Sequence, residues 1–531
     1  MNKILLIFVL LILLLPVGDS EHVLFQADMS SDSNSLDSSE TTVGENRTSD
    51  FEPETFNYEG NATAFTSPDS SRESIDRFLD DVDSSLYVGV YQFTNLQIAE
   101  KLANLSKEGV SIRVLVEGQP VQGMPKREIA SLNMISKEDC DVKLIGKDGN
   151  DPYEYYHPKY MIKDNRSVFI TSENFVSSGF PSDNSNGNRG WGIILENKKA
   201  ASYYGDVYQH DWEFGEDYEY QDIEYERYDI TSSYYSPEFN RTEINGEFEI
   251  TPVLSPDTAM DESTILEMIR GAEESIYVQQ YYIRYNDTDE NPYLEAVKEA
   301  SKRGVEVKIL LDSTWYNLEE DGNDKVVQEL SSFSSDEGVD LEARLFSDYK
   351  GLLKSHNKGI IVDEENVLVS TINWNDNSIF QNRELGVIVK NSDVGKYYSQ
   401  VFLDDWRDLV DPIGDAGDEK TIAVGEEARL TGKNSWDDHE IIEYRWDVDG
   451  DGVAEKKGEN ITLEFDEEVE CKITLTVEDV GGNTDKDSIE LKVEKKDEKG
   501  LFSEVLRWFF LLSPAALITS FLVKELIFSR S

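Results

Sequence analysis

The sequence contains little cysteine, little histidine and few basic side chains. Its two cysteines, Cys140 and Cys471, lie far apart among 531 residues, which excludes a disulfide framework and a zinc site built on a cysteine cluster. The 50 Lys and Arg residues stand against 107 Asp and Glu residues, for a formal net charge of −57. Such a surface repels polyanions and disfavours non-specific binding of nucleic acids. Because the acidic residues are spread along the whole chain, we interpret the charge as adaptation to high salt.

Two of the five histidines occupy matched positions in a repeated motif. The first copy reads His157-x-Lys159-x4-Asp164 and the second reads His356-x-Lys358-x4-Asp363, each within a short apolar run typical of a β-strand. Each copy is followed by a hydroxyl-x-Asn sequence, Ser172-Glu173-Asn174 or Thr371-Ile372-Asn373. The other histidines have no such counterpart, and we interpret them as surface or structural residues: His22, His210 and His439.

The duplication extends beyond this motif. The other shared sequences are Ser67-Pro68-Asp69 with Ser255-Pro256-Asp257, Gly109-Val110 with Gly304-Val305, Asn188-Arg189 with Asn382-Arg383, and Asp211-Trp212 with Asp405-Trp406. In both copies, apolar residues at helical spacing alternate with short Val- and Ile-rich runs, which predicts an α/β fold. The first copy predicts helices over 75–82 and 98–105 and strands over 86–93 and 111–116; the second predicts helices over 265–269 and 293–300 and strands over 275–283 and 306–311. The chain therefore contains two copies of one unit of ordinary domain size.

Paired His, Lys and Asn side chains suit chemistry on an anionic phosphodiester. A neutral imidazole can attack phosphorus and form a covalent intermediate, while a protonated imidazole on the opposite side donates to the departing oxygen. The charge on the non-bridging oxygens would be offset by Lys159, Lys358, Asn174 and Asn373. Because these groups belong to the chain itself, we expect no metal and no other cofactor. Either histidine can be the nucleophile.

These paired motifs resemble those of the phospholipase D superfamily, and the resemblance spans residues 66–410. It implies two duplicated α/β/α lobes with one active site at their pseudo-twofold interface. It also implies a phosphohistidine intermediate, usually on the N-terminal histidine. The remaining motif residues would be structural: Asp164, Asp363, Ser172 and Thr371.

The resemblance further implies a separate carboxylate that orients each histidine. Glu384 follows Asn382-Arg383 and matches this position in the second copy, so we expect it behind His356, where it would raise the basicity of the imidazole. The first copy departs from the pattern, because Asn188-Arg189 is followed by Gly190. Asp183 is the nearest candidate replacement.

Both ends of the chain carry apolar segments. Residues 1–20 are predicted to be a signal peptide, and residues 21–66 a disordered acidic linker rich in Ser and Thr. Residues 505–528 predict a C-terminal transmembrane anchor, with an interfacial helix as the alternative. The body of the protein would then lie at the cell surface, where glycosylation acceptors fit. The Asn-x-Ser/Thr acceptors are Asn46, Asn61, Asn104, Asn165, Asn240, Asn286 and Asn460.

Residues 411–495 form a third unit, before the anchor. Alternating runs over 427–430, 441–446, 461–465, 471–477 and 488–493 predict a small β-sandwich. The stretches 444–452 and 475–479 resemble a polycystic-kidney-disease-type (PKD) immunoglobulin-like domain, which implies a spacer or adhesion module. Asp447, Asp449 and Asp451 begin like a calcium loop, but Gly458 stands where an EF-hand has Glu. We therefore interpret them as a tight acidic turn.

Three functions remain open for the paired lobes, 67–215 and 247–410, which an acidic connector over 216–246 joins. The leading hypothesis is an exported, membrane-anchored phospholipase D-like phosphodiesterase that cleaves or transfers phospholipid headgroups, acting as a monomer whose lobes form one site. The first alternative is an exported nuclease, with a basic groove starting from Lys159, Lys354, Lys358 and Arg383. The second is an inactive surface binding or adhesion protein, which Gly190 and the β-sandwich spacer favour. Three tyrosines near the first motif either line a lipid or headgroup pocket or pack in the core: Tyr153, Tyr155 and Tyr156.

Overall fold

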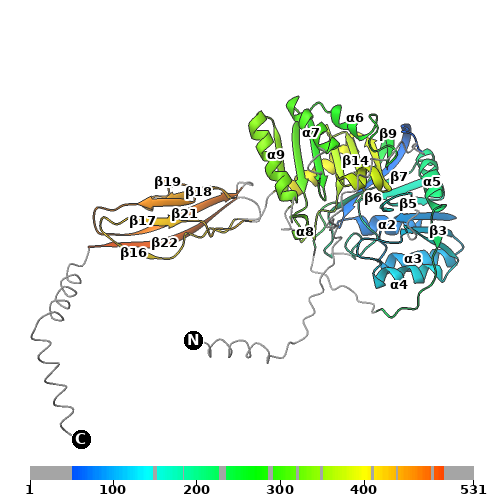
Figure 1. The fold of residues 1–531 in the computed structure, drawn as a ribbon, viewed down its shortest axis with the longest axis horizontal. Helices are drawn as coiled ribbons and strands as arrows, with labels where there is room; N and C mark the ends of the chain where they lie inside the picture. Colours follow the sequence, from blue (N-terminus) through cyan, green and yellow to red (C-terminus); the bar gives the residue numbers. More distant parts are fainter. Residues whose placement is uncertain are drawn as a thin grey trace, which may run out of the picture.

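The computed structural model describes residues 51–146, 152–182, 185–225, 235–284, 291–318, 322–346, 351–407, 412–437, 441–479 and 483–495. They form an α/β body and a small all-β domain (Figure 1). The expected signal peptide and anchor lie outside these residues. Within the described part of the chain, no helix is both long and apolar enough to span a membrane.

One 15-stranded sheet runs through both sequence copies. Read outward from its middle, the first half has the order β1-β7-β6-β5-β2-β3-β4, and the second has β9-β15-β14-β13-β10-β11-β12. The halves meet where β1 (Phe56–Ser67) pairs antiparallel with β9 (Thr242–Ser255). The two copies therefore share one topology, and the expected α/β class is confirmed.

The remaining strands follow the same plan in each half. The first half contains β2 (Ser85–Val90), β3 (Ser111–Glu117), β4 (Cys140–Ile145), β5 (Lys159–Lys163), β6 (Ser167–Thr171), β7 (Gly190–Leu195) and, at its edge, β8 (Glu216–Asp217). The second contains β10 (Ser275–Gln280), β11 (Glu306–Leu311), β12 (Leu341–Leu345), β13 (Lys358–Val362), β14 (Asn366–Ser370) and β15 (Glu384–Lys390). The repeated motifs thus begin equivalent strands, β5 and β13.

Helices cover both faces of each half of the sheet. The first half carries α2 (Ser71–Asp80), α3 (Leu96–Lys107), α4 (Lys126–Ser136) and α5 (Lys198–Trp212), and the second carries α6 (Ile265–Arg270), α7 (Pro292–Lys302), α8 (Trp315–Leu318), α9 (Asn323–Glu337), η1 (Asn377–Gln381) and α10 (Ser392–Trp406). Because side chains alternate along a strand, Tyr160 and Ile162 of β5 pack in a cluster with α5 and α10, while Met161 packs with α2, α3 and α4. Helices α5 and α10, one from each copy, thereby share one core between the lobes.

Buried ion pairs between the lobes explain three of the repeated sequences. Arg189 Nε lies 2.9 Å from Asp405 Oδ2 of the other lobe, and Arg383 Nε lies 3.1 Å from Asp211 Oδ2. Each guanidinium is also bonded within its own lobe, by Asp69 for Arg189 and by Asp257 for Arg383. The Asn-Arg, Asp-Trp and Ser-Pro-Asp repeats therefore supply one cross-lobe ion-pair network in duplicate. Such a network must stay complete, because a lone buried charge is strongly destabilising.

Two expected boundaries were wrong. The expected linker 21–66 overlaps β1, whose second half is buried and consists largely of small residues such as Ala62, Thr63 and Ala64. Small buried residues between polar ones do not give a strong hydrophobic pattern, so the sequence predicts a linker where this strand lies. The expected connector 216–246 likewise overlaps β8 and the start of β9.

The third unit is the expected β-sandwich. Its strands are β16 (Lys420–Ala423), β17 (Ala428–Thr431), β18 (Ile441–Asp447), β19 (Lys456–Lys457), β20 (Asn460–Leu463), β21 (Val469–Asp479) and β22 (Thr484–Glu494), arranged in a five-stranded and a two-stranded sheet. Trp446 is fully buried between them with Leu475 and Val477. Cys471 of this unit and Cys140 of the body are both free thiols.

Candidate active site

The two motif histidines are each held by the backbone of the opposite lobe. His157 N donates a 2.8 Å hydrogen bond to Arg383 O, and His356 N donates a 2.8 Å bond to Arg189 O. The same arginines carry the cross-lobe ion pairs. The sheet halves and the interface therefore fix both imidazoles at one junction, two residues before β5 and β13.

A carboxylate from the other lobe lies against each imidazole. Glu384 Oε2 is 2.7 Å from His157 Nδ1, and Glu384 is fully buried. The expectation that Glu384 stands behind His356 was therefore wrong. The strand order brings the residues just after β6 to His356 and the start of β15 to His157, in both cases across the lobe junction, which sequence spacing alone does not reveal.

Glu173 fills the position that Gly190 leaves open. Its Oε1 lies 3.4 Å from His356 Nδ1, and its Oε2 accepts a 2.9 Å hydrogen bond from Asn188 Nδ2. In the other lobe, Asn382 Nδ2 donates a matching 3.0 Å bond to Glu384 Oε1. A Cβ on Gly190 would stand 2.3 Å from Glu173 Oε1, so the glycine makes room for this carboxylate. Asp183, the expected replacement, lies outside the described residues.

The signal for Glu173 was present in the sequence. The middle position of the hydroxyl-x-Asn motif is Glu173 in one copy and Ile372 in the other, whereas the residue after Asn-Arg is Gly190 in one copy and Glu384 in the other. The first copy thus carries its carboxylate in the middle of the hydroxyl-x-Asn sequence, whereas the second copy carries it directly after Asn-Arg. Comparing both positions together would have identified the exchange.

Two buried lysines complete the centre. Lys159 Nζ donates to His157 O at 2.7 Å, and Lys358 Nζ donates to His356 O at 2.6 Å. Both side chains are fully buried. Burial, followed by the charge of Lys159, holds the pKa of Lys358 well below its usual range. Two ammonium groups enclosed this closely create a site for an anion.

The asparagines and hydroxyl residues of the motifs are also buried. Asn174 and Asn373 are almost fully buried. Ser172 Oγ accepts from Trp191 N at 3.1 Å, while Thr371 Oγ1 donates to Glu384 Oε2 at 2.6 Å. The hydroxyl residues therefore hold the strands and the carboxylate that support the imidazoles.

The motif aspartates bind backbone and face away from this chemistry. Asp164 accepts from the amides of residues 83–85 at 2.7–3.0 Å, and Asp363 accepts from those of residues 273–275 at 2.8–3.0 Å. Both have a positive φ, 51° and 53°. Each carboxylate thus fixes the loop that leads into β2 or β10.

The two imidazole–carboxylate pairs differ in their ionisation. Burial alone would raise the pKa of Glu384, but the charge of His157 and its hydrogen bond outweigh burial, and the pKa is lowered. For Glu173, burial dominates and raises the pKa to about 7. Burial and then Lys358 and Lys354 lower the pKa of His356 well below its usual value, whereas Glu384 partly offsets the burial of His157. His157 therefore lies beside an ionised carboxylate, and His356 beside one that gains a proton near neutral pH.

A tyrosine that sequence reasoning missed packs edge-on against each histidine. The ring centres of Tyr91 and His157 are 4.7 Å apart, and those of Tyr281 and His356 are 4.9 Å apart. Both tyrosines directly follow strands β2 and β10. Of the tyrosines near the first motif, Tyr153 and Tyr156 are buried in the core and only Tyr155 is half-exposed.

Comparison with known proteins agrees with this architecture. The family model for "Cardiolipin synthase, PLD-like domain" matches residues 75–212 and 265–406, and the model for the PKD domain matches 409–493. The chain belongs to the phospholipase D-like family. Its C-terminal unit is a PKD domain, as the sequence indicated.

Similarity to individual members of the phospholipase D-like family is local. Over 137 residues the chain is 28% identical to cardiolipin synthase A of Buchnera aphidicola subsp. Acyrthosiphon pisum (strain APS), covering 26% of each protein. Over 136 residues it is 29% identical to phospholipase D of Rickettsia typhi, covering 26% of this chain and 58% of that one. The chain thus matches only part of the length of these curated relatives. The phosphatidylserine synthase of Haemophilus influenzae Rd KW20 aligns at a TM-score of 0.48 and 12% identity, covering 64% of this chain and 86% of the other.

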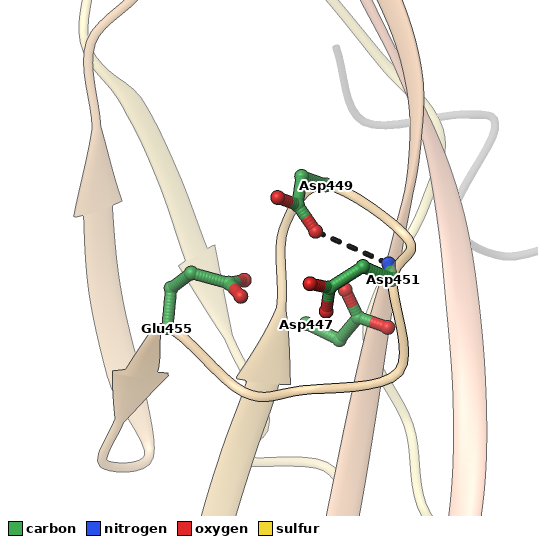
Figure 2. Close-up of side chains that lie close together, drawn as sticks. All are labelled: Asp447, Asp449, Asp451 and Glu455. Atoms are coloured by element: carbon green, nitrogen blue, oxygen red, sulfur yellow. Dashed lines mark hydrogen bonds between the residues drawn. The ribbon is translucent and has the colours of Figure 1, made fainter.

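The PKD domain holds an acidic turn that fits the sequence interpretation. Four side chains, Asp447, Asp449, Asp451 and Glu455, bring their oxygens within 4.8 Å of one another (Figure 2). They accept hydrogen bonds from backbone amides of the turn, including Gly450 N to Asp447 Oδ1 at 2.7 Å and Asp451 N to Asp449 Oδ1 at 3.1 Å. Among the described residues this is the group whose oxygens could hold a divalent cation. It is mostly exposed and belongs to a different domain from the paired histidines.

Proposed function

We propose that this protein is an exported, membrane-anchored phosphodiesterase of the phospholipase D type, which cleaves or transfers phospholipid headgroups through a phosphohistidine intermediate. The observation that carries the proposal is a pair of imidazoles, each backed by a carboxylate of the opposite lobe and flanked by a buried lysine. The relatives named cardiolipin synthase and phospholipase D support a phospholipid as substrate. The apolar segments at both ends of the sequence support export and anchoring at the cell surface.

In the proposed first half-reaction, His157 is the nucleophile. Its Nδ1 donates to the ionised Glu384 and leaves Nε2 with a free electron pair. Nε2 forms a bond to phosphorus while the bond from phosphorus to the headgroup oxygen breaks. That oxygen takes the proton of the Glu173–His356 pair, which the charge of the bound phosphodiester draws from Glu173 onto His356. The phosphorylated imidazole carries a positive charge, which Glu384 stabilises. Lys159 and Lys358 offset the charge of the non-bridging oxygens.

In the second half-reaction, His356 reverses its role. It takes a proton from water or from an alcohol, whose oxygen bonds to phosphorus while the bond to His157 breaks. Water gives hydrolysis, and an alcohol gives headgroup transfer. Glu173, with a pKa raised to about 7, suits this partner because His356 must gain and lose a proton in each cycle.

The inactive alternative loses its main argument. It rested on Gly190 in place of a carboxylate, and Glu173 supplies that carboxylate from the neighbouring strand end. The nuclease alternative stays as an arm of the test, since a phosphodiester in nucleic acid has the same reacting atoms.

The deciding experiment measures headgroup release by the full-length protein in detergent micelles at high salt. We expect phospholipid turnover that is lost in the His157→Ala and His356→Ala variants. Cleavage of single-stranded DNA without lipid turnover would instead make the protein a nuclease. Wild-type activity no greater than that of the variants on every substrate would support the inactive surface-protein alternative.

A second measurement separates the two histidines. With bis(p-nitrophenyl) phosphate the departing phenolate needs little help from an acid, so His356→Ala should release one equivalent and retain a phosphoryl adduct on His157, detected by intact-mass spectrometry. His157→Ala should form no adduct. An adduct on His356 in the His157→Ala variant would reverse the assignment.

A further inference from the structure

The segments leading into the two histidines have the same backbone but different side chains. Arg383 N donates to Tyr155 O at 2.9 Å, and Arg189 N donates to Lys354 O at 2.8 Å. Tyr155 and Lys354 each precede a catalytic histidine by two residues. They therefore occupy equivalent positions, one on each side of the site, so the difference between them is a difference in side-chain chemistry alone.

Lys354 brings a third ammonium group to the His356 side. Its Nζ donates to Tyr281 Oη at 3.2 Å and lies 4.6 Å from the centre of that ring. Lys358 Nζ lies 4.8 Å from the same ring centre, and the ring packs against His356. After burial and Lys358, the charge of Lys354 contributes to the lowered pKa of His356. The side chain is thus electrostatically part of the catalytic centre.

The His157 side is built without this cation. The hydroxyl of Tyr91, the counterpart of Tyr281, accepts from the backbone amide of Val121 at 2.9 Å. Tyr155 places its ring 6.3 Å from that of Tyr91, and its neighbour Glu154 is exposed. The two sides of the site therefore differ in their side chains: Lys354 lies beside His356, whereas Tyr155 and Glu154 lie on the His157 side.

We propose that Lys354 is a specificity-determining residue, which selects substrates whose departing group carries a second phosphate. The proposal rests on the proposed function, in which the headgroup departs on the His356 side. A scissile phosphodiester carries one negative charge, and Lys159 and Lys358 already face it. A third ammonium raises the repulsion among these cations, as its contribution to the lowered pKa of Lys358 indicates. A further anion in the bound substrate relieves this repulsion.

The test compares phosphatidylinositol with phosphatidylinositol 4-phosphate, which differ only by one phosphate on the headgroup. Both are presented to the full-length protein at the same mole fraction in zwitterionic micelles, and release of the common product, phosphatidic acid, is measured. We expect wild-type kcat/KM to favour the 4-phosphate by about tenfold, the order expected for one added charge pair about 4 Å apart in a largely solvated setting. Lys354→Ala should remove the preference, and Lys354→Arg should keep it.

Tyr155→Ala is the matched control at the equivalent position before His157, and it should leave the preference unchanged. Equal turnover of the two lipids by the wild-type protein, or an unchanged ratio in Lys354→Ala, would overturn the proposal. A dinucleotide with and without a terminal phosphate forms the nucleic-acid arm. A phosphate preference confined to that arm would assign Lys354 to a nucleotide substrate and overturn the choice of a phospholipid.

A binding measurement keeps this inference separate from the proposed function. Inorganic pyrophosphate and inorganic phosphate are titrated calorimetrically into the wild-type protein and Lys354→Ala. Tighter binding of pyrophosphate by the wild-type protein alone would support the role of Lys354 even if no lipid is turned over. Equal binding of pyrophosphate by both proteins would refute the role even if lipids are cleaved.

Discussion

At the scale of single residues, the two buried carboxylates make the stability of the fold depend on pH in opposite directions. Glu384 lies 2.7 Å from His157 and has a lowered pKa, so its ionised form stabilises the folded state above the unfolded pKa. Glu173 lies 3.4 Å from His356 and has a pKa raised to about 7. Between the unfolded pKa and about 7, the unfolded chain releases a proton that the folded chain retains. Folding therefore becomes less favourable as pH rises through this window.

Glutamine substitutions should consequently change stability in opposite directions. At pH 8 we expect Glu173→Gln to raise the free energy of unfolding by about 1–3 kcal/mol, because the amide removes a buried charge and keeps the bond from Asn188. Glu384→Gln should lower it. Denaturant unfolding at pH 8 and near pH 4 measures both effects. The gain for Glu173→Gln should vanish at the lower pH, where the carboxyl is neutral in both states; a gain that persists there would contradict the assigned ionisation.

Both variants should also lose activity, by about 100-fold, since groups that orient a reacting imidazole typically contribute at this level. A Glu173→Gln variant that is more stable but less active would mark the carboxylate as functional. Unchanged kcat/KM would show that His356 does not need it.

At the scale of elements, each carboxylate is presented by a pair of antiparallel strands. Strands β6 and β7 carry Glu173 just after β6 and Gly190 at the start of β7, whereas β14 and β15 carry Ile372 and Glu384 at the same places. The pairs have matching registers, with Thr171 opposite Gly192 and Ser370 opposite Gly386. The carboxylate can thus be supplied from either strand of the same hairpin.

This equivalence predicts that the carboxylate can be moved. Gly190→Glu alone should be destabilising and inactive, since its Cβ would approach Glu173 Oε1 to 2.3 Å. Glu173→Ile alone should be inactive. The Glu173→Ile/Gly190→Glu double variant copies the arrangement of the second lobe and should recover at least about tenfold over Glu173→Ile, one unit of 1.4 kcal/mol in the barrier.

The recovery is measured as kcat/KM, with circular dichroism to verify folding. A folded double variant without recovery would show that Glu173 acts through more than the position of its charge. Matched pH profiles in the wild-type protein and the double variant would show the same charge acting from the new strand.

At the scale of the whole molecule, a net charge of −57 acts on every surface of a body held together by buried, paired charges. Long-range repulsion among surface carboxylates opposes the compact state and is screened by salt, with a Debye length of about 10 Å at 0.1 M and about 3 Å at 1 M. The buried arginine network is shielded from solvent and responds much less.

We therefore expect the melting temperature to rise by about 2 °C or more between 0.1 and 2 M NaCl, the effect of a gain of roughly 2 kcal/mol in a chain of this size. Differential scanning fluorimetry measures it. Sucrose at matched osmolality serves as the control, because it stabilises by exclusion without screening. A melting temperature that falls with NaCl but rises with sucrose would show that repulsion among surface carboxylates does not limit the thermal stability of the protein.

The sequence alone determined the duplication, the α/β class and the PKD domain, and it predicted the paired His, Lys and Asn residues of the candidate site. These follow from local patterns, since strands, helices and paired motifs repeat along the chain. Glu384 was also found, because it follows Asn382-Arg383 directly.

Only the tertiary structure decided which groups face one another. Glu384 orients His157 and not His356, Glu173 replaces the carboxylate missing at Gly190, and Tyr91, Tyr281 and Lys354 join the centre. Each of these contacts joins distant segments, and the two carboxylate–histidine contacts cross the lobe interface. Strand β1 was missed for a related reason: its small residues carry a weak pattern, and they are buried because β1 lies in the middle of the sheet, between β7 and β9, where helices cover both faces. Periodicity records which face of an element is apolar, whereas the identity of the partner on that face depends on the order of strands in the sheet.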